Sequence, residues 1–471
     1  MNTNRVKPQG IARTGAASDD SAEPSQPWSL RREQIFVTAQ NPQPVESVAS
    51  QGTTVGDWSS ATKTSDTIQF PIDFNITCLR PFLAAIYRAY HQLCYKDLCL
   101  DFSACERADA APILGIIAYC RYLRRVGIEF TTILPNSPYL RRLFLNSNWA
   151  HSFSPSEYGE SNFRTRTQVP VLAFTNAHEQ KIVVDRVIDC ILSCVNGYSR
   201  EHLKAIEWSV NEITDNVLMH SNSPDGGILQ LTSKQKAKLI EFVVADSRDG
   251  IPKSLRSSRL PISSDVDALS RAIEQGVTRD EAIGQGNGLW GSYRIAVKSD
   301  GKFDIHSGYA TLFYTANAGM HTRTEQVPYT GTVVHCSINY GTRLILDDIL
   351  GLGRKFDPTD RVELRYEVNS DDTIPFKLKN EAESLGSRLA GKKIRIKLQN
   401  LVSCSDCRID VDFTDINLIS SSFADEVFGK LFLQLGPIDF GQRIMLSKIQ
   451  STVKLLVDRA ISQRVAFGRF D

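Results

Sequence analysis

Polar side chains at a regular spacing mark the stretch from Asn211 to His220, near the middle of the chain. Glu212, Asn216 and His220 follow one another at intervals of four residues, so on a helix they share one face. A carboxylate there can take a proton from water, and an amide oxygen one turn away can ligate Mg²⁺ beside a phosphate. The same stripe also fits an ordinary solvated helix face, and the pattern alone leaves both interpretations open.

An aspartate at the end of an apolar run is the second candidate. Asp246 follows Leu239 to Ala245, which reads as a buried strand. A carboxylate at the end of such a strand is costly without a partner, so we expect it to meet a ligand or a buried donor. Gly250 lies four residues further on and permits close approach of the backbone.

A glycine-rich run is the third candidate. It reads Gly284-Gln285-Gly286-Asn287-Gly288-Leu289 and precedes an apparent helix that ends at about Lys298. Backbone N–H groups of such a loop can turn toward phosphate, aided by the positive end of the helix dipole. A flexible turn has the same composition. A Rossmann site is disfavoured, because the run does not open a first βαβ unit and its spacing is GxGxG, not GxGxxG.

The elements that must position these residues follow from periodicity. The sequence predicts two long helices, then two strands, a polar stretch at about 253 to 283 that we interpret as a lid, the helix to about Lys298, and closing strands. The predicted helices are Ile182 to Val195 and Glu201 to His220, and the predicted strands are Gly227 to Leu231, Leu239 to Ala245, Phe303 to His306, Ala310 to Thr315 and Gly331 to Ile338.

This order of motifs resembles the GHKL ATP-binding fold of histidine kinases, type II topoisomerases, mismatch-repair ATPases and related chaperones, and the helix motif is most similar to that of anti-sigma-factor serine kinases. The resemblance implies an ATP site with Mg²⁺, in which Glu212 is the catalytic base, Asn216 the Mg²⁺ ligand and Asp246 the partner of the adenine amino group. It also implies that Gly250 belongs to a first glycine box, that Gly284, Gly286, Gly288 and Leu289 belong to a second box on the triphosphate, and that Thr332 lies near the adenine.

One position departs from the family pattern Asp-x-Gly-x-Gly. Arg248 stands where the first glycine is expected, between Asp246 and Gly250. An arginine there can narrow the adenine pocket and weaken affinity, or it can supply a new phosphate contact. A degenerate fold that keeps its shape without nucleotide is the alternative to an ATP site.

The region before the centre predicts a βαβα order, with strands at Leu98 to Phe102 and Ile128 to Leu134 and helices at Ala111 to Arg125 and from Pro138. It resembles a STAS domain, the fold of anti-sigma-factor antagonists. In that family a serine after an aspartate at the start of a helix accepts phosphate. Here that place reads Asp109-Ala110-Ala111, so the resemblance implies a docking or dimerisation module without a phosphoacceptor.

The C-terminal region also resembles a STAS-like module. Its segment Asp412 to Ser421 parallels Asp101 to Ala110, so the two flanking regions are interpreted as diverged copies. Ser421 occupies the phosphoacceptor position, preceded by Ser420 and not by the family's aspartate. An N-cap serine without phosphate chemistry is the alternative for Ser421. Further predictions in this region are strands at Arg361 to Glu367, Lys393 to Leu398 and Arg408 to Phe413, and a helix at Ala382 to Leu389.

Composition bounds the class of protein. The chain has 471 residues and a formal net charge of +1, which gives no electrostatic case for nucleic acid or an anionic membrane. No apolar run is long enough to span a bilayer, and the ten cysteines fit free thiols in a reducing compartment. We therefore expect an α/β protein in the cytoplasm, with a disordered tail at 1–65, a STAS-like module at 66–160, a GHKL domain at 175–345 and a second STAS-like module at 355–471.

The function expected from this combination is bacterial signalling by an ATP- and Mg²⁺-binding regulator. Closure of the lid controls how the STAS-like modules bind protein partners, with ATPase activity at Glu212. A serine protein kinase and a non-enzymatic scaffold stabilised by nucleotide are the alternatives. Whether the chain forms a homodimer stays open at this point.

Overall fold

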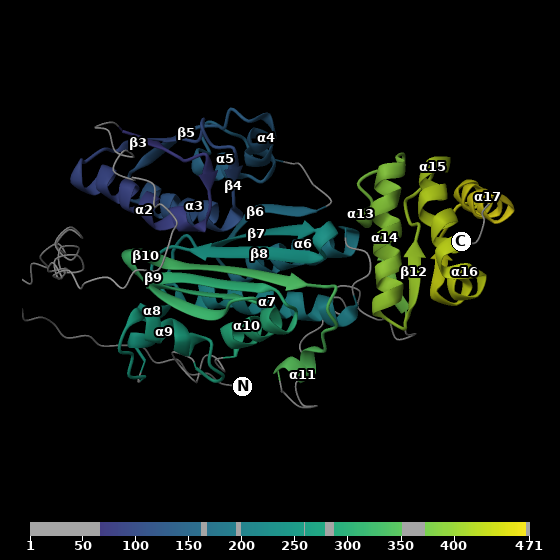
Figure 1. Cartoon of the computed structure of the whole chain (residues 1–471). Coiled ribbons are helices and arrows are strands. Elements are labelled where there is room, and N and C mark those ends of the chain that lie inside the picture. The colour runs from purple at the N-terminus through teal and green to yellow at the C-terminus, as the bar shows by residue number, and fades with distance from the viewer. Residues whose placement is uncertain are drawn as a thin grey trace, which may run out of the picture. The chain divides into compact units, whose positions relative to one another are not determined.

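Three main sheets organise the part of the chain that the structure, a computed structural model, describes (Figure 1). The described residues are 66–161, 167–194, 199–258, 260–277, 287–350 and 373–467. We call residues 66–161 the N-terminal module, 167–350 the central region and 373–467 the C-terminal module. Helices and strands are both abundant, so the predicted α/β class is confirmed. The tail predicted for residues 1–65 lies outside the described residues.

The N-terminal module is built on a parallel sheet in the order β1-β3-β5. Its strands are β1 (Thr67–Gln69), β3 (Asp97–Asp101) and β5 (Glu129–Ile133), and its α-helices are α2 (Leu79–Tyr87), α3 (Ala110–Arg125), α4 (Pro138–Asn146) and α5 (Trp149–Phe153). A short second pair joins β2 (Asp73–Phe74) to β4 (Arg107–Ala108). The predicted strands and helices are confirmed to within a few residues, whereas β1 and α2 were not predicted.

The central region carries an antiparallel five-stranded sheet in the order β6-β7-β8-β10-β9. The strands are β6 (Gln168–Phe174), β7 (Gly227–Lys234), β8 (Leu239–Asp246), β9 (Lys302–Thr315) and β10 (Gly319–Asn339). The two short strands predicted between Phe303 and Thr315 are one continuous strand, β9. The reason is that β9 pairs along its length with the still longer β10.

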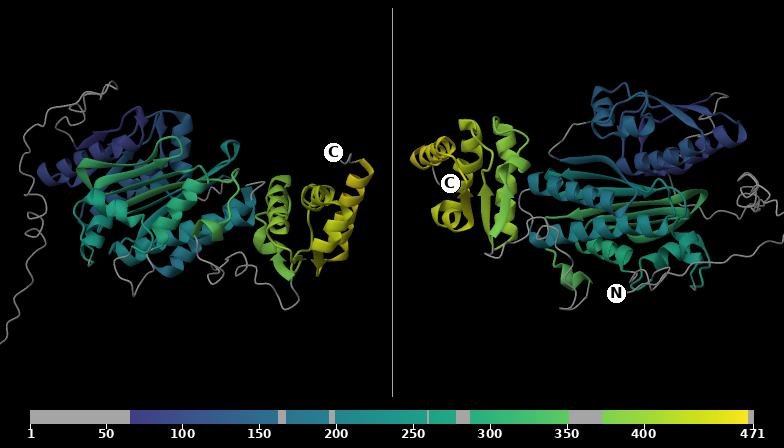
Figure 2. Two further views of the ribbon diagram at one scale, coloured as in Figure 1. Left: turned by 60° about the horizontal axis from the view of Figure 1, so that its bottom comes forward. Right: turned by 180° about the vertical axis from the view of Figure 1, so that it is seen from behind.

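Helices cover one face of this sheet (Figure 2). They are α6 (Ala177–Cys194), α7 (Arg200–His220) and α10 (Gly288–Lys298). Phe242 and Val244 of β8 belong to the apolar cluster beneath these helices, whereas Val243 and Ala245 belong to a second cluster that includes α3. Because successive side chains of a strand point to opposite faces, β8 is buried on both sides, which explains its unbroken apolar run.

The polar stretch interpreted as a lid includes two short helices among its described residues. It contains α8 (Ile251–Arg256) and α9 (Asp265–Ala272), and α9 lies against β9. Residues 259 and 278–283 of this stretch lie outside the described residues.

The C-terminal module repeats the parallel arrangement in the order β11-β12-β13. Its strands are β11 (Thr373–Lys377), β12 (Arg408–Asp412) and β13 (Ile444–Ser447), and its helices are α13 (Leu378–Glu381), α14 (Arg388–Cys404), α15 (Ser421–Ala424), the π-helical turn η6 (Asp425–Gly429), α16 (Lys430–Arg443) and α17 (Ser451–Phe467). The strand predicted at Arg408 to Phe413 is confirmed as β12.

Two C-terminal predictions were wrong. The strand predicted at Lys393 to Leu398 lies inside α14, because the alternation that suggested it does not separate a wet face from a dry one: Arg395 and Lys397 are both buried. The helix predicted at Ala382 to Leu389 does not form, because residues 382–387 link α13 to α14. The strand predicted at Arg361 to Glu367 lies outside the described residues. Among the described helices, none combines the length and apolarity needed to cross a membrane.

Candidate functional site

The helical stripe of α7 meets the start of α10. A Cβ atom placed on Gly288 would lie 2.7 Å from Oε2 of Glu212 and 3.3 Å from Nδ2 of Asn216. The structure therefore brings three of the sequence-predicted site residues together, and the close approach favours glycine at 288. Leu289 is half-buried and packs against the apolar cluster of the central region.

The electrostatics of this corner suit proton transfer. Burial, with a smaller effect of the negative charge of Asp215, raises the pKa of Glu212 to about 7. A carboxyl group whose pKa lies near neutral pH is a suitable general base. Gln180 of α6, which the sequence did not single out, steadies the same helix because its Nε2 donates to Oδ1 of Asp215 at 2.7 Å and to Oγ1 of Thr214 at 2.9 Å.

Glu212, Asn216 and Gly288 form the first corner of the candidate site, and the second corner lies around Asp246 at the end of β8. Asp246 is 4% exposed, and its Oδ1 has no hydrogen-bond partner. Burial raises the pKa of Asp246 well above its ordinary range, although the backbone N–H of Thr332 donates to its carboxylate. An unpaired buried carboxyl oxygen is unfavourable, and a ligand that supplied a donor would relieve this cost.

Gly250 packs tightly against the paired strands β9 and β10. A Cβ atom on Gly250 would overlap Oγ of Ser307 and come within 2.6 Å of the carbonyl oxygen of Gly331. Oγ of Ser307 accepts from the backbone N–H of Ile251 at 2.9 Å, donates to the Gly331 carbonyl at 2.7 Å and lies 3.2 Å from Oγ1 of Thr332. Ser307 is thus a site residue that the sequence analysis missed, since it lay in the gap between two predicted strands.

Arg248 lies away from the buried carboxylate. Its side chain is exposed, and one guanidinium nitrogen donates to the carbonyl of Asn222 at 3.2 Å. The backbone N–H of Asp249 donates to the carbonyl of Ser221 at 3.0 Å, which ties this loop to the end of α7. Arg248 does not adopt a positive φ, so the backbone at this position does not require the glycine of the family pattern.

Two predicted site residues cannot be placed. Gly284 and Gly286 lie outside the described residues, so the described part of the glycine run begins at Asn287. His220 is half-buried at the end of α7.

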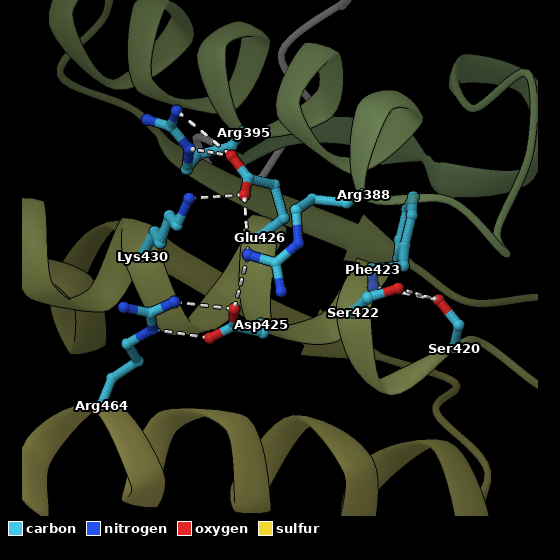
Figure 3. A network of polar contacts seen from close by, with 9 residues as sticks. All are labelled: Arg388, Arg395, Ser420, Ser422, Phe423, Asp425, Glu426, Lys430 and Arg464. Atoms are coloured by element: carbon cyan, nitrogen blue, oxygen red, sulfur yellow. Dashed lines mark hydrogen bonds and ion pairs between the residues drawn. The ribbon is translucent and has the colours of Figure 1, made fainter. Parts of the chain in front are cut away.

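The start of α15 in the C-terminal module separates two serines that the sequence treated together. Ser420 is the N-cap residue, because its side chain accepts from the backbone N–H of Phe423 at 3.0 Å (Figure 3). Its Oγ also lies 3.0 Å from Oγ of Ser422. Ser421 is exposed at the first helical position, so the N-cap interpretation of Ser421 was wrong.

A buried network of charges fixes the helix that follows these serines (Figure 3). Glu426 is 2% exposed and lies 2.6 Å from Nζ of Lys430 and 3.5 Å from Nε of Arg395. Asp425 accepts two hydrogen bonds from Arg464 of α17, at 2.6 and 2.8 Å. These bonds favour the ionised carboxylate and lower the pKa of Asp425. Both acidic residues stand in the π-helical turn η6, which the network holds between α14 and α17.

Comparison with known proteins supports one part of the sequence interpretation. A family model described as a STAS-like domain of unknown function (DUF4325) matches residues 390–454, from α14 to the start of α17. This region is therefore similar to a STAS-like domain, a kind of interaction module, as predicted. No curated protein matches the chain. The GHKL resemblance of the central region stays a prediction.

Proposed function

We propose that the chain binds ATP and Mg²⁺ in its central region and thereby regulates protein interactions made by two STAS-like flanking modules. The observation that carries the proposal is the unpartnered Oδ1 of buried Asp246. An adenine amino group is a donor of the required kind. The backbone N–H of Thr332 donates to this carboxyl group, and the GHKL resemblance implies that Thr332 lies near the adenine.

The α7 corner supports the Mg²⁺ part of the proposal. The amide oxygen of Asn216 is a hard ligand of the kind that Mg²⁺ prefers, and the start of α10 at Gly288 lies close to the side chain that carries it. The main readout is a binding titration of the full chain with ATP, ADP and GTP, each with and without Mg²⁺. We expect ATP to bind more tightly than GTP, and Mg²⁺ to strengthen ATP binding.

Variants test the two corners separately. Asp246→Asn should weaken ATP binding, whereas Asp304→Asn, which changes a half-buried carboxylate of β9 that binds His335, should not. Asn216→Ala should abolish the effect of Mg²⁺. A wild-type chain that binds no nucleotide, or an Asp246→Asn variant that binds ATP as well as wild type, would contradict the proposal.

ATP hydrolysis is the reaction we propose for this site. Glu212 would act as the base toward water, and only its ionised form can accept the proton. Because its pKa is raised to about 7, the hydrolysis rate should be low at pH 6 and rise through pH 7. Glu212→Gln should keep nucleotide binding and lose turnover. Turnover that is unchanged in this variant would reject Glu212 as the base.

A serine protein kinase is the second candidate, and the exposed hydroxyl of Ser421 favours it, since Ser420 has taken the capping role. Incubation with γ-labelled ATP and Mg²⁺ distinguishes the two reactions. Label retained on wild type and on Ser422→Ala but lost from Ser421→Ala supports the kinase. Free phosphate without labelled protein supports hydrolysis. ATP binding with neither product leaves the non-enzymatic scaffold.

A further inference from the structure

The N-terminal module reaches the back of the candidate ATP site through one tyrosine. Tyr329 of β10 is 1% exposed, and its hydroxyl oxygen lies 3.1 Å from the carbonyl oxygen of Gly115 and 3.0 Å from that of Asp246. Gly115 belongs to α3, and Asp246 carries the unpaired carboxyl oxygen. A single hydroxyl group therefore joins the backbone of the docked module to the backbone of the predicted adenine-binding residue.

The strand around Tyr329 is irregular in a way that serves this contact. The register between β9 and β10 shifts on both sides of Tyr329, between Thr324 and Thr332. Gly331 has a φ of +115°, and a Cβ atom there would overlap the carbonyl oxygen of Asp246. The bulge thus brings β10 unusually close to the end of β8, and it presents Thr332 to the carboxyl group of Asp246.

An arginine of the N-terminal module holds the same bulge. Arg80 of α2 is 6% exposed and donates to the carbonyl oxygens of Gly308, Val327 and Ala310, at 2.7, 2.9 and 3.0 Å. Its guanidinium group also lies 5.9 Å from the centre of the Tyr329 ring. These bonds reach both strands of the bulge, so α2 restrains it from the face opposite α7.

The docked helix has little freedom at this point. A Cβ atom on Gly115 would lie 2.8 Å from Cδ1 of Leu79 and 3.2 Å from Cγ2 of Val333. A side chain at position 115 would therefore be crowded against α2 and β10. A small shift of α3 on the sheet would change the distance between the Gly115 carbonyl and the hydroxyl group of Tyr329.

We propose that docking of the N-terminal module sets the affinity of the ATP site, and that Tyr329 is the positioning residue through which the module acts on Asp246. The inference rests on the proposed function, since it concerns regulation of that site. Coupling between two sites is reciprocal, so bound ATP must also strengthen docking of the module. Anything that pulls the module from the sheet would then release nucleotide.

The test compares two losses of one hydrogen bond in the same interface. Tyr329→Phe keeps the ring and removes the hydroxyl group. The matched control is Gln230→Met, which removes the acceptor of the buried bond from Nε1 of Trp149, 2.6 Å away on β7. We expect Tyr329→Phe to raise the Kd for ATP by about 5- to 30-fold, within the usual range of coupling between sites, and Gln230→Met to change it by less than about twofold.

Hydrogen exchange on the full chain supplies a readout that simple destabilisation would not change. Mg²⁺-ATP should slow exchange in α2 and α3 of wild type and of Gln230→Met, and should not do so in Tyr329→Phe. If Tyr329→Phe does not fold, Arg80→Lys should shift Kd and exchange in the same direction. An unchanged Kd in Tyr329→Phe, or hydrogen exchange in wild-type α3 that does not change when ATP binds, overturns this inference but not the proposed function. A wild type that binds no ATP overturns the proposed function as well.

Discussion

The N-terminal and C-terminal modules have the same chain topology but meet the central region by different means. Each has three parallel strands in sequence order with helices between them. The turn after the middle strand is also the same, because Oδ1 of Asp101 accepts from the backbone N–H of Ser103 at 2.8 Å, and Oδ1 of Asp412 accepts from that of Thr414 at 2.7 Å. This agreement in detail supports the interpretation of the two modules as diverged copies.

The next bonds agree as well. Phe102 donates its backbone N–H to the carbonyl of Ile133, and Phe413 donates to that of Ser447, at 2.9 and 3.1 Å. Eight residues after each aspartate comes the N-cap of the next helix, Asp109 in one module and Ser420 in the other. What differs is the use of that helix. In the N-terminal module α3 covers the central sheet, whereas α15 begins with an exposed serine.

The buried cations at the two attachments differ in their partners. Among the described residues, the hydrogen bonds of Arg80 go to neutral backbone carbonyls, and burial lowers the pKa of its guanidinium group to about 10. Lys397 of α14 is 4% exposed and pairs with two carboxylates, Asp189 of α6 at 2.8 Å and Glu381 of its own module. The buried cation at one attachment thus donates to dipoles, whereas the buried cation at the other forms an ion pair.

Removal of the buried ion pair should have the largest effect. Lys397→Met removes a buried cation that pairs with Asp189 and Glu381, so we expect a loss of roughly 3 kcal/mol in the free energy of unfolding in urea. The control is Lys393→Met on the same helix. Lys393 pairs with the exposed carboxylate of Glu383, so its loss should cost less than about 1 kcal/mol. Equal losses in the two variants would mean that the buried ion pair of Lys397 stabilises the fold no more than the ion pair of Lys393.

Removal of the buried arginine should cost less. Arg80→Met leaves unpaired carbonyl dipoles but no unpaired charge, so we expect a loss of about 2 kcal/mol. Arg107→Met is the control, since Arg107 is exposed and its ion pair, 3.5 Å from Asp73, is exposed to water as well. Urea unfolding of the full chain measures both. A loss for Arg80→Met that exceeds the loss for Lys397→Met would show that the dipole contacts hold their module more strongly than the ion pair.

These pairings also explain what the sequence could and could not predict. The spacing of Glu212 and Asn216 is set by the helix itself, so their common face was predictable. The alternation around Arg395 and Lys397 failed as a strand signal, because pairing with carboxylates across the fold lets cations be buried on a helix. Tyr329 was missed for a related reason, since its role depends on a strand register that local sequence does not encode.

The helix caps offer a smaller test of the same comparison. Ser420→Ala removes the bond to the N–H of Phe423 and should cost about 1 kcal/mol. Asp109 occupies the equivalent place in α3 but makes no side-chain capping bond, so Asp109→Ala should cost much less. Thermal unfolding of the two variants measures the difference. A similar loss in both would mean that the two helix starts are energetically alike despite their different contacts.

The smallest effect should be an opposite response of the two modules to acid. Hydrogen bonds from Thr414 and Lys448 outweigh burial and lower the pKa of Asp412 to about 2, so its stabilisation is complete above the unfolded value near 4 and is lost as the pH falls toward 2. Burial raises the pKa of Asp109, so its contribution is complete below the unfolded value and is lost as the pH rises through the folded one. Between pH 7 and pH 4 only the beginning of the loss at Asp412 is reached. When the pH is lowered from 7 to 4, hydrogen exchange, corrected for its intrinsic pH dependence, should therefore become slightly faster around β12 and slightly slower at the start of α3. A change in the same direction at both places would contradict the pKa shifts assigned to Asp412 and Asp109.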